Sequence, residues 1–536
     1  MRSKTESALI VGAGPVGLTL ALALDRRGVP VRIIDSAATR TDTSKALVLW
    51  PRTLEMLDIE GCADRFVNSG IRGTGARLRS DRGELAHMTF GGLDSPFPFP
   101  VLIPQSETER ILGELLEERG VVVERESTLR EFSSHDDGVH LVITGPDGKE
   151  EAVITPWLLA CDGAHSTVRR GLGVEFSGTT LDMDFVLADV HLDGDLPDGE
   201  LSIVLAPEGV VALFPIIGGR FRVVAEIHER PATDEGPTLD AVQVLLDRRV
   251  PVPLRAHDLV WASNFRINER KVEAYRHGRV FLAGDAAHVH SPAGGQGMNT
   301  GMQDAFNLAW RLSIVARGIA HDELLDGYSV ERSAVADMVL RNAGAMTRMT
   351  GIRNGMLQRL RNAVIRVAGR RAAFRRRMVE QLSEVDVAYR HGDLSIHTPD
   401  QAPGLAPGDR VRDLDIVLLE EAPTTLHGAL RDGRFLLLSV GCDALEVPPD
   451  LRGLAHAAVA ASLGLPVIAV ASRTQERATA LANRVRAKAV PYSELPAGAD
   501  IVVVQTPPAQ HHSDALRALR AGAAVIVEKP LCTTLQ

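Results

Sequence analysis

The sequence predicts an α/β protein: a Rossmann-like dinucleotide-binding domain with an inserted antiparallel-sheet domain and a C-terminal α/β appendage. Three observations predict this class. Residues 8–35 alternate strand, glycine turn, helix and strand, which is a βαβ unit. Residues 183–228 contain short β-prone runs separated by turn residues. The chain has 536 residues, more than one domain usually holds, so we expect two or three domains.

Composition narrows the class of protein. Hydrophobic residues make up 45% and charged residues 24%, which is typical of a globular protein. The net charge of -10 and an aromatic content of 4% argue against a nucleic-acid partner. No apolar stretch approaches the ~20 residues that cross a bilayer, so no membrane association is expected. The cysteines have no metal-ligand spacing, which favours a cytoplasmic protein without a metal site: Cys62, Cys161, Cys442 and Cys532.

The first βαβ unit is the clearest local prediction. Ala8–Val11 is an apolar strand, Val16–Leu24 has helical spacing, and Gly28 with Pro30 ends that helix before a second strand. Helices are also predicted over Thr108–Arg119 and Gly301–Ala316. The remaining predicted strands are Val121–Glu124, two flanking the turn Gly145–Gly148, Asp184–Leu192, Leu201–Ala206, Val210–Pro215, Phe221–Ile227 and Val280–Ala283.

These elements divide into four expected parts. Arginines among apolar residues over 352–377 predict a solvated amphipathic helix, and a Pro/Gly/Asp-rich stretch over 398–410 predicts a linker. The expected domains are a discontinuous dinucleotide-binding domain (1–175 and 276–345, with part of 70–105 in the next domain), a substrate domain (176–275), a helical connector (346–397) and a C-terminal α/β domain (404–536).

The glycine motif between the first strand and helix predicts a pyrophosphate site. Gly12, Gly14 and Gly17 allow a tight turn and close approach of backbone N–H groups to a phosphate at a helix N-terminus. Asp35 ends the next strand, about 20 residues further on, where an acid binds a ribose. The alternative is a glycine turn that serves only helix–strand packing. This motif alone does not distinguish FAD from NAD.

Two further motifs follow buried strands. Cys161-Asp162-Gly163 leads into a short segment that contains Arg169. Gly284-Asp285 follows Val280–Ala283 and precedes the glycine-rich loop 291–299, which opens an apolar helix. Such a loop presents free N–H groups and the positive end of a helix dipole, which suits the negative charge of a reduced flavin.

The order of these three motifs resembles the class A flavoprotein monooxygenases of the para-hydroxybenzoate hydroxylase fold. Within them the sequence is most similar to the aromatic polyketide hydroxylases, since Trp50–Glu55 and Pro104–Glu109 also match that group. The resemblance covers about residues 6–440. It implies these cofactor-binding residues: Gly12, Gly14, Pro15, Gly17, Asp35, Lys45, Gln105, Asp162, Gly163, Arg169, Gly284, Asp285, Pro292, Gly295, Gln296, Gly297, Met298 and Asn299.

The resemblance also implies a division of roles. Gly12–Gly17 and Asp35 would hold the ADP half of FAD, while Gln105 and Asp285 would contact its flavin side. Asp162 and Arg169 would serve both FAD and NADPH, and residues 295–299 would line the isoalloxazine. The family usually has Glu at Asp35 and Arg at Lys45, where lysine keeps the charge but loses the bidentate geometry.

The resemblance implies oxygenation of an aromatic, polyketide-type small molecule by a monomer or homodimer. NADPH would reduce FAD, O2 would add at C4a, and the hydroperoxide would transfer oxygen. No catalytic base is assigned, and His165, His288 and His290 are expected to be structural or adjacent to the flavin. Baeyer–Villiger oxygenation and a non-catalytic flavoprotein binder remain open. A halogenase is disfavoured because its WxWxIP motif is absent.

The C-terminal region departs from this pattern. Residues 404–440 resemble the start of the family's thioredoxin-like domain. Residues 453–536 instead resemble the nucleotide-binding half of the Gfo/Idh/MocA oxidoreductases, on the strand Leu465–Arg473, the strand Ile501–Thr506 and the motif Glu528-Lys529-Pro530. The first glycine loop of that family is missing, so we interpret this segment as a structural remnant. A sugar dehydrogenase acting through Lys529 is the alternative.

Overall fold

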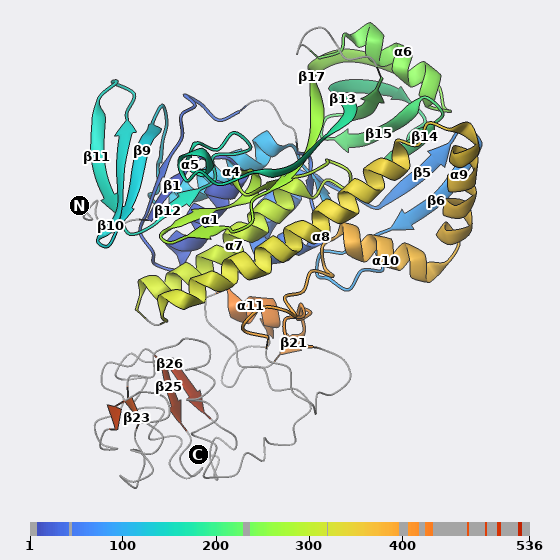
Figure 1. The fold of residues 1–536 in the computed structure, drawn as a ribbon. Coiled ribbons are helices and arrows are strands. Elements are labelled where there is room, and N and C mark those ends of the chain that lie inside the picture. The colour runs from blue at the N-terminus through green and yellow to red at the C-terminus, as the bar shows by residue number, and fades with distance from the viewer. Residues whose placement is uncertain are drawn as a thin grey trace, which may run out of the picture. The chain divides into compact units, whose positions relative to one another are not determined.

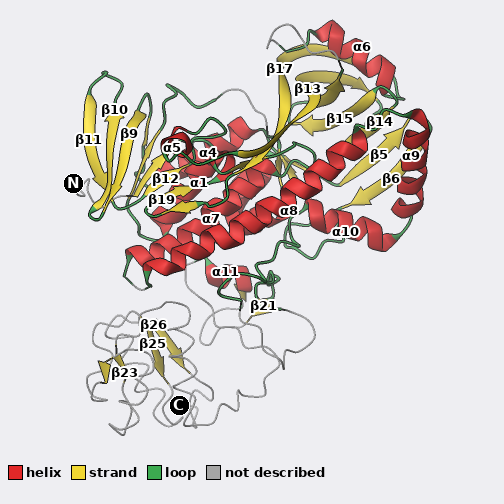
Figure 2. Cartoon of the chain, viewed as in Figure 1, coloured by secondary structure: helices red, strands yellow, loops and turns green. Residues whose placement is uncertain are grey.

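The structure is a computed structural model that describes residues 8–41, 46–228, 236–318, 320–395, 406–416 and 424–431, and four short strands between 469 and 527. Contacts divide the chain into two compact units. The first comprises Met1–Ser313 and Gly327–Phe435, and the second comprises Ile314–Asp326 and Leu436–Gln536. Figures 1 and 2 show the elements of each unit.

A six-stranded sheet forms the centre of the first unit. Its order is β18-β19-β12-β1-β2-β8, and every pair is parallel except the hairpin β18–β19. Strands β1, β12 and β19 are fully buried, which explains their continuous apolar sequences. The strands are β1 (Ala8–Val11), β2 (Val31–Ile34), β8 (Val123–Glu124), β12 (Leu158–Ala160), β18 (Arg276–His277) and β19 (Val280–Leu282).

An eight-stranded sheet forms the second layer of this unit, shown at the upper right of Figure 1. Its order is β20-β17-β13-β16-β15-β14-β5-β6. The sheet is mixed, not wholly antiparallel as expected, because β14 pairs in parallel with β5, which comes from a distant part of the chain. The strands are β5 (Gly75–Ser80), β6 (Gly83–Thr89), β13 (Ser177–Gly194), β14 (Glu200–Ala206), β15 (Gly209–Ile216), β16 (Arg220–Ile227), β17 (Leu254–Lys271) and β20 (His288–Val289).

The two faces of this sheet are different. Alternate residues such as Val186, Ala188 and Val190 form a buried core with Val242 and Leu246 of helix α6 (Leu239–Arg249). The opposite face carries Phe185 and Asp189 on β13. Because successive side chains of a strand point to opposite faces, α6 covers only the first of these faces.

Besides the antiparallel pair of β21 (Asp415–Ile416) and β22 (Thr424–Thr425), two small sheets complete the described strands of the unit. One is a three-stranded antiparallel sheet of β9 (Thr128–His135), β10 (Gly138–Thr144) and β11 (Glu150–Thr155). In the other, β7 (Val101–Leu102) pairs with β3 (Val48–Leu49) and with β4 (Ile71–Arg72). Strand β3 leads directly to Trp50, whose indole contacts the loop at Gly294 and Gly295.

Helices cover the sheets and connect them. The predicted arginine-rich helix is two helices, α9 (Gly355–Gly369) and α10 (Ala372–Leu382). The break allows Gly369 to pack against Ala86 of β6, where a Cβ on Gly369 would lie 2.8 Å from the Ala86 Cβ. The other helices of this unit are α1 (Pro15–Arg26), α2 (Pro51–Ile59), α3 (Ala63–Ser69), α4 (Gln105–Glu118), α5 (Thr167–Gly171), α7 (Gly297–Ala316), α8 (Asp326–Thr350) and α11 (Leu426–Leu430).

From Leu436 onward, the second unit is described through four short strands alone. β23 (Ala469–Val470) pairs in parallel with β24 (Lys488–Ala489), and β25 (Ile501–Val504) pairs in parallel with β26 (Ala524–Val527). β23 and β25 lie within the two strands predicted for this region. Parallel pairs are typical of an α/β layer. The motif Glu528-Lys529-Pro530 lies outside the described residues.

Most predicted elements are confirmed, with shifted ends. The four strands predicted over 184–227 are β13 to β16, and the helix predicted from Gly301 begins at Gly297. The helix predicted from Thr108 begins at Gln105. The boundaries of the expected domains stay a prediction. Among the described residues, no helix combines the length and apolar character needed to span a bilayer.

Candidate functional site

The three glycines of the loop after β1 serve two different purposes. Gly12 has φ 101°, and a Cβ there would lie 2.3 Å from the backbone oxygen of Cys161. A Cβ on Gly17 would lie 1.9 Å from the backbone oxygen of Gly12. A Cβ on Gly14 would meet no atom within 4 Å. Gly12 and Gly17 therefore permit close packing, whereas Gly14 borders open space that a ligand can approach.

The N-terminus of α1 opens beside this space. Gly14 is the N-cap, Pro15 is the first helical residue, and no side chain caps the helix. The uncapped N–H groups and the helix dipole favour an anion there. Asp35 lies at the same loop, because its Oδ2 accepts a hydrogen bond of 2.6 Å from Ala13 N.

The three predicted motifs meet at one edge of the six-stranded sheet. They follow β1, β12 and β19, which are adjacent parallel strands. A Cβ on Gly284 would lie 2.8 Å from Val16 of α1, and one on Gly301 of α7 would lie 3.1 Å from Gly284 Cα. The glycines therefore allow α1, the Gly284 turn and α7 to pack without intervening side chains.

Asp162 combines a structural contact with an unused acceptor. Its Oδ2 accepts hydrogen bonds from Thr167 N at 2.7 Å and Val168 N at 3.1 Å. Its Oδ1 is buried and has no hydrogen-bond partner among the described residues. Because buried acceptors are normally paired, Oδ1 is suited to receive a ligand hydroxyl.

Arg169 connects the second motif to the third. It donates to the backbone oxygens of Ala164 at 2.7 Å and Ala286 at 3.0 Å, and lies over the ring of Phe176. Burial lowers the pKa of Arg169 from its ordinary value. The side chain therefore holds two loops together, and its expected contacts with FAD and NADPH stay a prediction.

A buried ion pair anchors the Gly284 turn. Asp304 Oδ2 accepts hydrogen bonds from Gly284 N at 3.0 Å and His288 Nε2 at 2.8 Å. Asp304 Oδ1 accepts a hydrogen bond of 2.6 Å from Arg332 Nε, and Arg332 also donates a hydrogen bond to Thr300 O. Burial by itself raises the pKa of Asp304, but Arg332 and His288 bring it below its ordinary value.

The loop 291–297 is held by two side chains. Trp50 Nε1 donates to Gly294 O at 3.0 Å and to Gly295 O at 3.2 Å. Asn299 accepts from Trp50 N and donates to Val48 O, each at 2.8 Å. Gly294 and Gly295 have φ values of 94° and 64°, which favour glycine. The loop thus has a defined shape at the N-terminus of α7.

The remaining predicted residues have different surroundings. Gln105 contacts Ala46 N and Glu109, close to β3. Gln296 donates to Gln381 O at 2.9 Å and is buried. Pro292 and Asp285 are exposed, whereas Gly163, Gly297 and Met298 are half-buried. Lys45 lies outside the described residues.

The three histidines differ in their surroundings. His288 is fully buried on Asp304, as expected for a structural residue. Burial and the nearby His288 lower the pKa of His290 to about 4. His165 is exposed.

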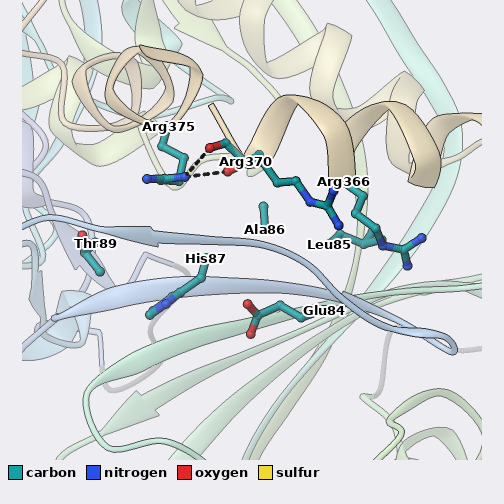
Figure 3. A pocket seen from close by; sticks show the side chains of 9 residues that line it. Glu84, Leu85, Ala86, His87, Thr89, Arg366, Arg370 and Arg375 are labelled. Carbon is teal, nitrogen blue, oxygen red and sulfur yellow. Dashed lines mark hydrogen bonds between the residues drawn. The ribbon is translucent and has the colours of Figure 1, made fainter. Parts of the chain in front are cut away.

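A hollow of about 610 Å³ lies away from these motifs, between β6 and the junction of α9 and α10. Arg366 and Arg370 border it from the helices, and Glu84 and His87 of β6 are also among its lining residues (Figure 3). Arg375 is turned to the helix end, where it donates to Gly369 O and Arg370 O. The hollow is lined by none of the predicted cofactor residues.

These observations fit FAD. The open space at Gly14, the uncapped end of α1 and Asp35 suit an ADP moiety. The unpaired Asp162 Oδ1 suits a hydroxyl, and the N-terminus of α7 suits the electron-rich part of the flavin.

Sequence reasoning missed the residues that support this site. Asp304 could have been noticed as the acid in the apolar helix after Asn299. Arg332 and Glu384 carry no local signal, because their contacts arise only when α8 and the end of α10 pack against α7.

The glycines give a paired test of the site. We expect Gly17→Ala to destabilise the fold, because its Cβ overlaps the Gly12 oxygen. We expect Gly14→Ala to leave unfolding by urea nearly unchanged, because its φ of -78° suits alanine. It should weaken FAD binding on the order of tenfold, since overpacking costs ~1–3 kcal/mol. Unchanged affinity in Gly14→Ala, measured by flavin fluorescence titration, would place the cofactor elsewhere.

The buried ion pair gives a second prediction. Arg332→Met leaves the Asp304 charge buried without its partner and should lower the free energy of unfolding by roughly 3–5 kcal/mol. Arg376→Met is the control, because Arg376 pairs with Glu380 on the exposed surface of α10, and its loss should be far smaller. Chemical denaturation measures both. Similar losses in the two variants would contradict the anchoring role of Arg332.

Two sequence families match the chain. The family described as "FAD binding domain" matches residues 5–343, and the "Oxidoreductase family, NAD-binding Rossmann fold" matches residues 452–536. The chain is 37% identical to 6-methylpretetramide 4-monooxygenase of Streptomyces rimosus over 456 residues, which cover 83% of this chain and 81% of the relative. It is 34% identical to anhydrotetracycline monooxygenase of the same species over 456 residues, with 81% and 85% covered.

Solved structures agree with the sequence relatives. OxyS anhydrotetracycline hydroxylase from Streptomyces rimosus has a TM-score of 0.67 and 32% identity, and the match covers 84% of this chain and 88% of that one. CabE, an aromatic hydroxylase from angucycline biosynthesis, has a TM-score of 0.66 and 32% identity, with 80% and 84% covered. The motif geometry and these matches together show that the chain belongs to the FAD-binding-domain family of flavin-dependent monooxygenases.

Proposed function

We propose that this protein is a monooxygenase that uses FAD, NADPH and O2 to hydroxylate an aromatic, polyketide-type small molecule. The observation that carries the proposal is the meeting of three motifs at adjacent strand ends, between the N-termini of α1 and α7. When bound and reduced by NADPH, FAD supplies the chemistry that activates O2. The protein's own task is to hold the cofactor, orient the substrate and exclude water.

Each end of the site has a proposed task. The Gly12–Gly17 loop and the end of α1 bind the pyrophosphate, and Asp35 binds the adjoining ribose. Asp162 Oδ1 accepts a hydrogen bond from a hydroxyl group of the cofactor. The loop 291–297 presents backbone N–H groups to the electron-rich edge of the flavin, where the dipole of α7 favours negative charge.

The substrate is proposed to lie on the face of the eight-stranded sheet that α6 does not cover. Phe185 and Phe265 stack there, with ring centroids 5.6 Å apart. Arg222 on the same face forms a two-point hydrogen bond with Asp189 and reaches Ala46 O at 3.5 Å. Ala46 precedes β3 and Trp50, so this face continues toward the loop 291–297, called the flavin loop below. Aromatic rings at that position suit a planar aromatic ligand.

The relatives support the substrate class. Several act on tetracycline-type polyketides by name, and pentachlorophenol 4-monooxygenase of Sphingobium chlorophenolicum acts on a simple phenol. All these names describe oxygen insertion into aromatic or polycyclic molecules. We therefore propose an aromatic polyketide as the substrate, without assigning the position that is oxygenated.

The decisive test combines absorbance with turnover. The purified protein should show a bound flavin spectrum and oxidise NADPH faster when a suitable aromatic polyketide is added. Mass spectrometry should show a product that has gained one oxygen atom. Product structure then separates a hydroxylated ring from a Baeyer–Villiger ester or lactone.

The other outcomes have clear meanings. A flavin spectrum without substrate-stimulated NADPH oxidation would favour a non-catalytic binder. A protein that takes up no FAD and consumes no NADPH would contradict the proposal. NAD-linked sugar oxidation that is lost in Lys529→Ala would instead favour a working C-terminal dehydrogenase.

A further inference from the structure

Glu384 is a buried acid at the base of the flavin loop, in a backbone position that is unusual for glutamate. It follows helix α10 and its cap Ser383, and its φ is 57°. The residue at this position after a helix is usually glycine, because a Cβ is disfavoured in the left-handed conformation. Glu384 is only 1% exposed. A strained and buried glutamate persists only where the surroundings hold it.

The surroundings of the Glu384 carboxyl group are the first two turns of α7. Thr300 Oγ1 lies 3.0 Å from Glu384 Oε1, and Gln303 Nε2 donates to Glu384 Oε2 at 2.6 Å. Neither partner is charged. The charge of Arg332 lowers the pKa of Glu384, but Arg332 is already paired with Asp304, and the acid Asp386 acts in the opposite direction. Arg52, whose backbone N–H contacts Ser383 O, has its guanidinium on Glu55.

The hydrogen bonds of the Thr300 hydroxyl indicate which protonation state of Glu384 fits its surroundings. The Thr300 hydroxyl lies 3.0 Å from both Gln296 O and Glu384 Oε1, yet it has one proton to donate. If Glu384 is ionised, two acceptors compete for that proton. If Glu384 is protonated, it donates to Thr300, and Thr300 donates to Gln296. Only the neutral acid satisfies this chain of hydrogen bonds.

The chain of hydrogen bonds ends in the flavin loop. Gln296 belongs to that loop, and its side chain donates to Gln381 O, three residues before Glu384. Leu382 lies beside the loop, since a Cβ built on Gly294 would be 3.6 Å from its Cδ2. Residues 381–384 therefore adjoin the loop, and Trp50 and Asn299 hold it through further hydrogen bonds.

We propose that Glu384 is a positioning residue, held as a neutral carboxylic acid, that sets the loop 291–297 for FAD through Thr300 and Gln296. This inference rests on the proposed function. Ionisation would break the hydrogen-bond chain and place a negative charge beside the first turns of α7. That negative charge would partly cancel the positive potential that the N-terminus of α7 provides for the flavin.

The pH dependence follows from burial. Burial raises the pKa of Glu384 to about 8, against the hydrogen bonds from Thr300 and Gln303 and the charge of Arg332, which lower it. A carboxyl group whose pKa is raised on folding contributes stability below its unfolded pKa. That contribution is lost as the pH rises toward the folded value. FAD affinity should fall over the pH range in which Glu384 ionises.

The test compares Glu384→Gln with the wild type between pH 6.5 and 9. Flavin fluorescence titration of the apoprotein should show a wild-type FAD dissociation constant that rises threefold to tenfold, on the order of a helix-dipole effect. Glutamine keeps the shape and neutrality of the acid, so Glu384→Gln should match the wild type at pH 6.5 and remain flat. Its melting temperature should exceed that of the wild type by an amount that grows up to about pH 8, where Glu384 ionises in the folded protein, and then levels off.

Glu380→Gln is the matched control. It removes an acid from α10 that pairs with Arg376 at the surface, so it should keep the wild-type pH dependence. An equal rise in Glu384→Gln, or a wild type without any rise, would overturn the inference and leave FAD binding intact. A chain that takes up no FAD at either pH would overturn the proposed function, and this inference with it.

Discussion

The buried Asp304 carboxylate is the contact on which the arrangement of the site depends. It forms hydrogen bonds with the N–H of Gly284, the ring of His288 and the guanidinium of Arg332. These contacts connect the end of β19 to α7 and α8. A charge in this position is stable only because every partner is present. Since Arg332 also reaches Thr300 O, the same contact fixes the first turn of α7. The turn after β19 and the start of α7 are thus held as one piece.

Close backbone packing is the second constraint, and it acts through glycine. Gly12, Gly17, Gly284 and Gly301 lie where a Cβ would meet backbone or Val16, so α1, α7 and the strand ends approach each other closely. Gly14 differs because it borders open space. The same residue type therefore builds the packing and leaves room for a pyrophosphate. This contrast supports FAD binding more directly than the motif does by itself.

The loop at the start of α7 connects the cofactor to the proposed substrate face. Trp50 and Asn299 join it to β3, and Arg222 joins the large sheet to Ala46 at the start of the same segment. On its other side the loop rests on residues 381–384. A flavin placed there would be supported by parts of the chain more than 300 residues apart. The shape of the loop is consequently a property of the whole first unit.

The sequence by itself determined the elements and motifs whose cause is local. The apolar strands, the glycine spacing, Asp35, Asp162 and Gly284-Asp285 can be recognised along the chain, because strand and turn preferences act over a few residues. Only the tertiary structure decided that the large sheet is mixed, that Arg332 neutralises Asp304, and that Glu384 lies beneath α7. The physical reason is that burial and charge pairing depend on segments distant in sequence, and no local pattern encodes which of them will meet.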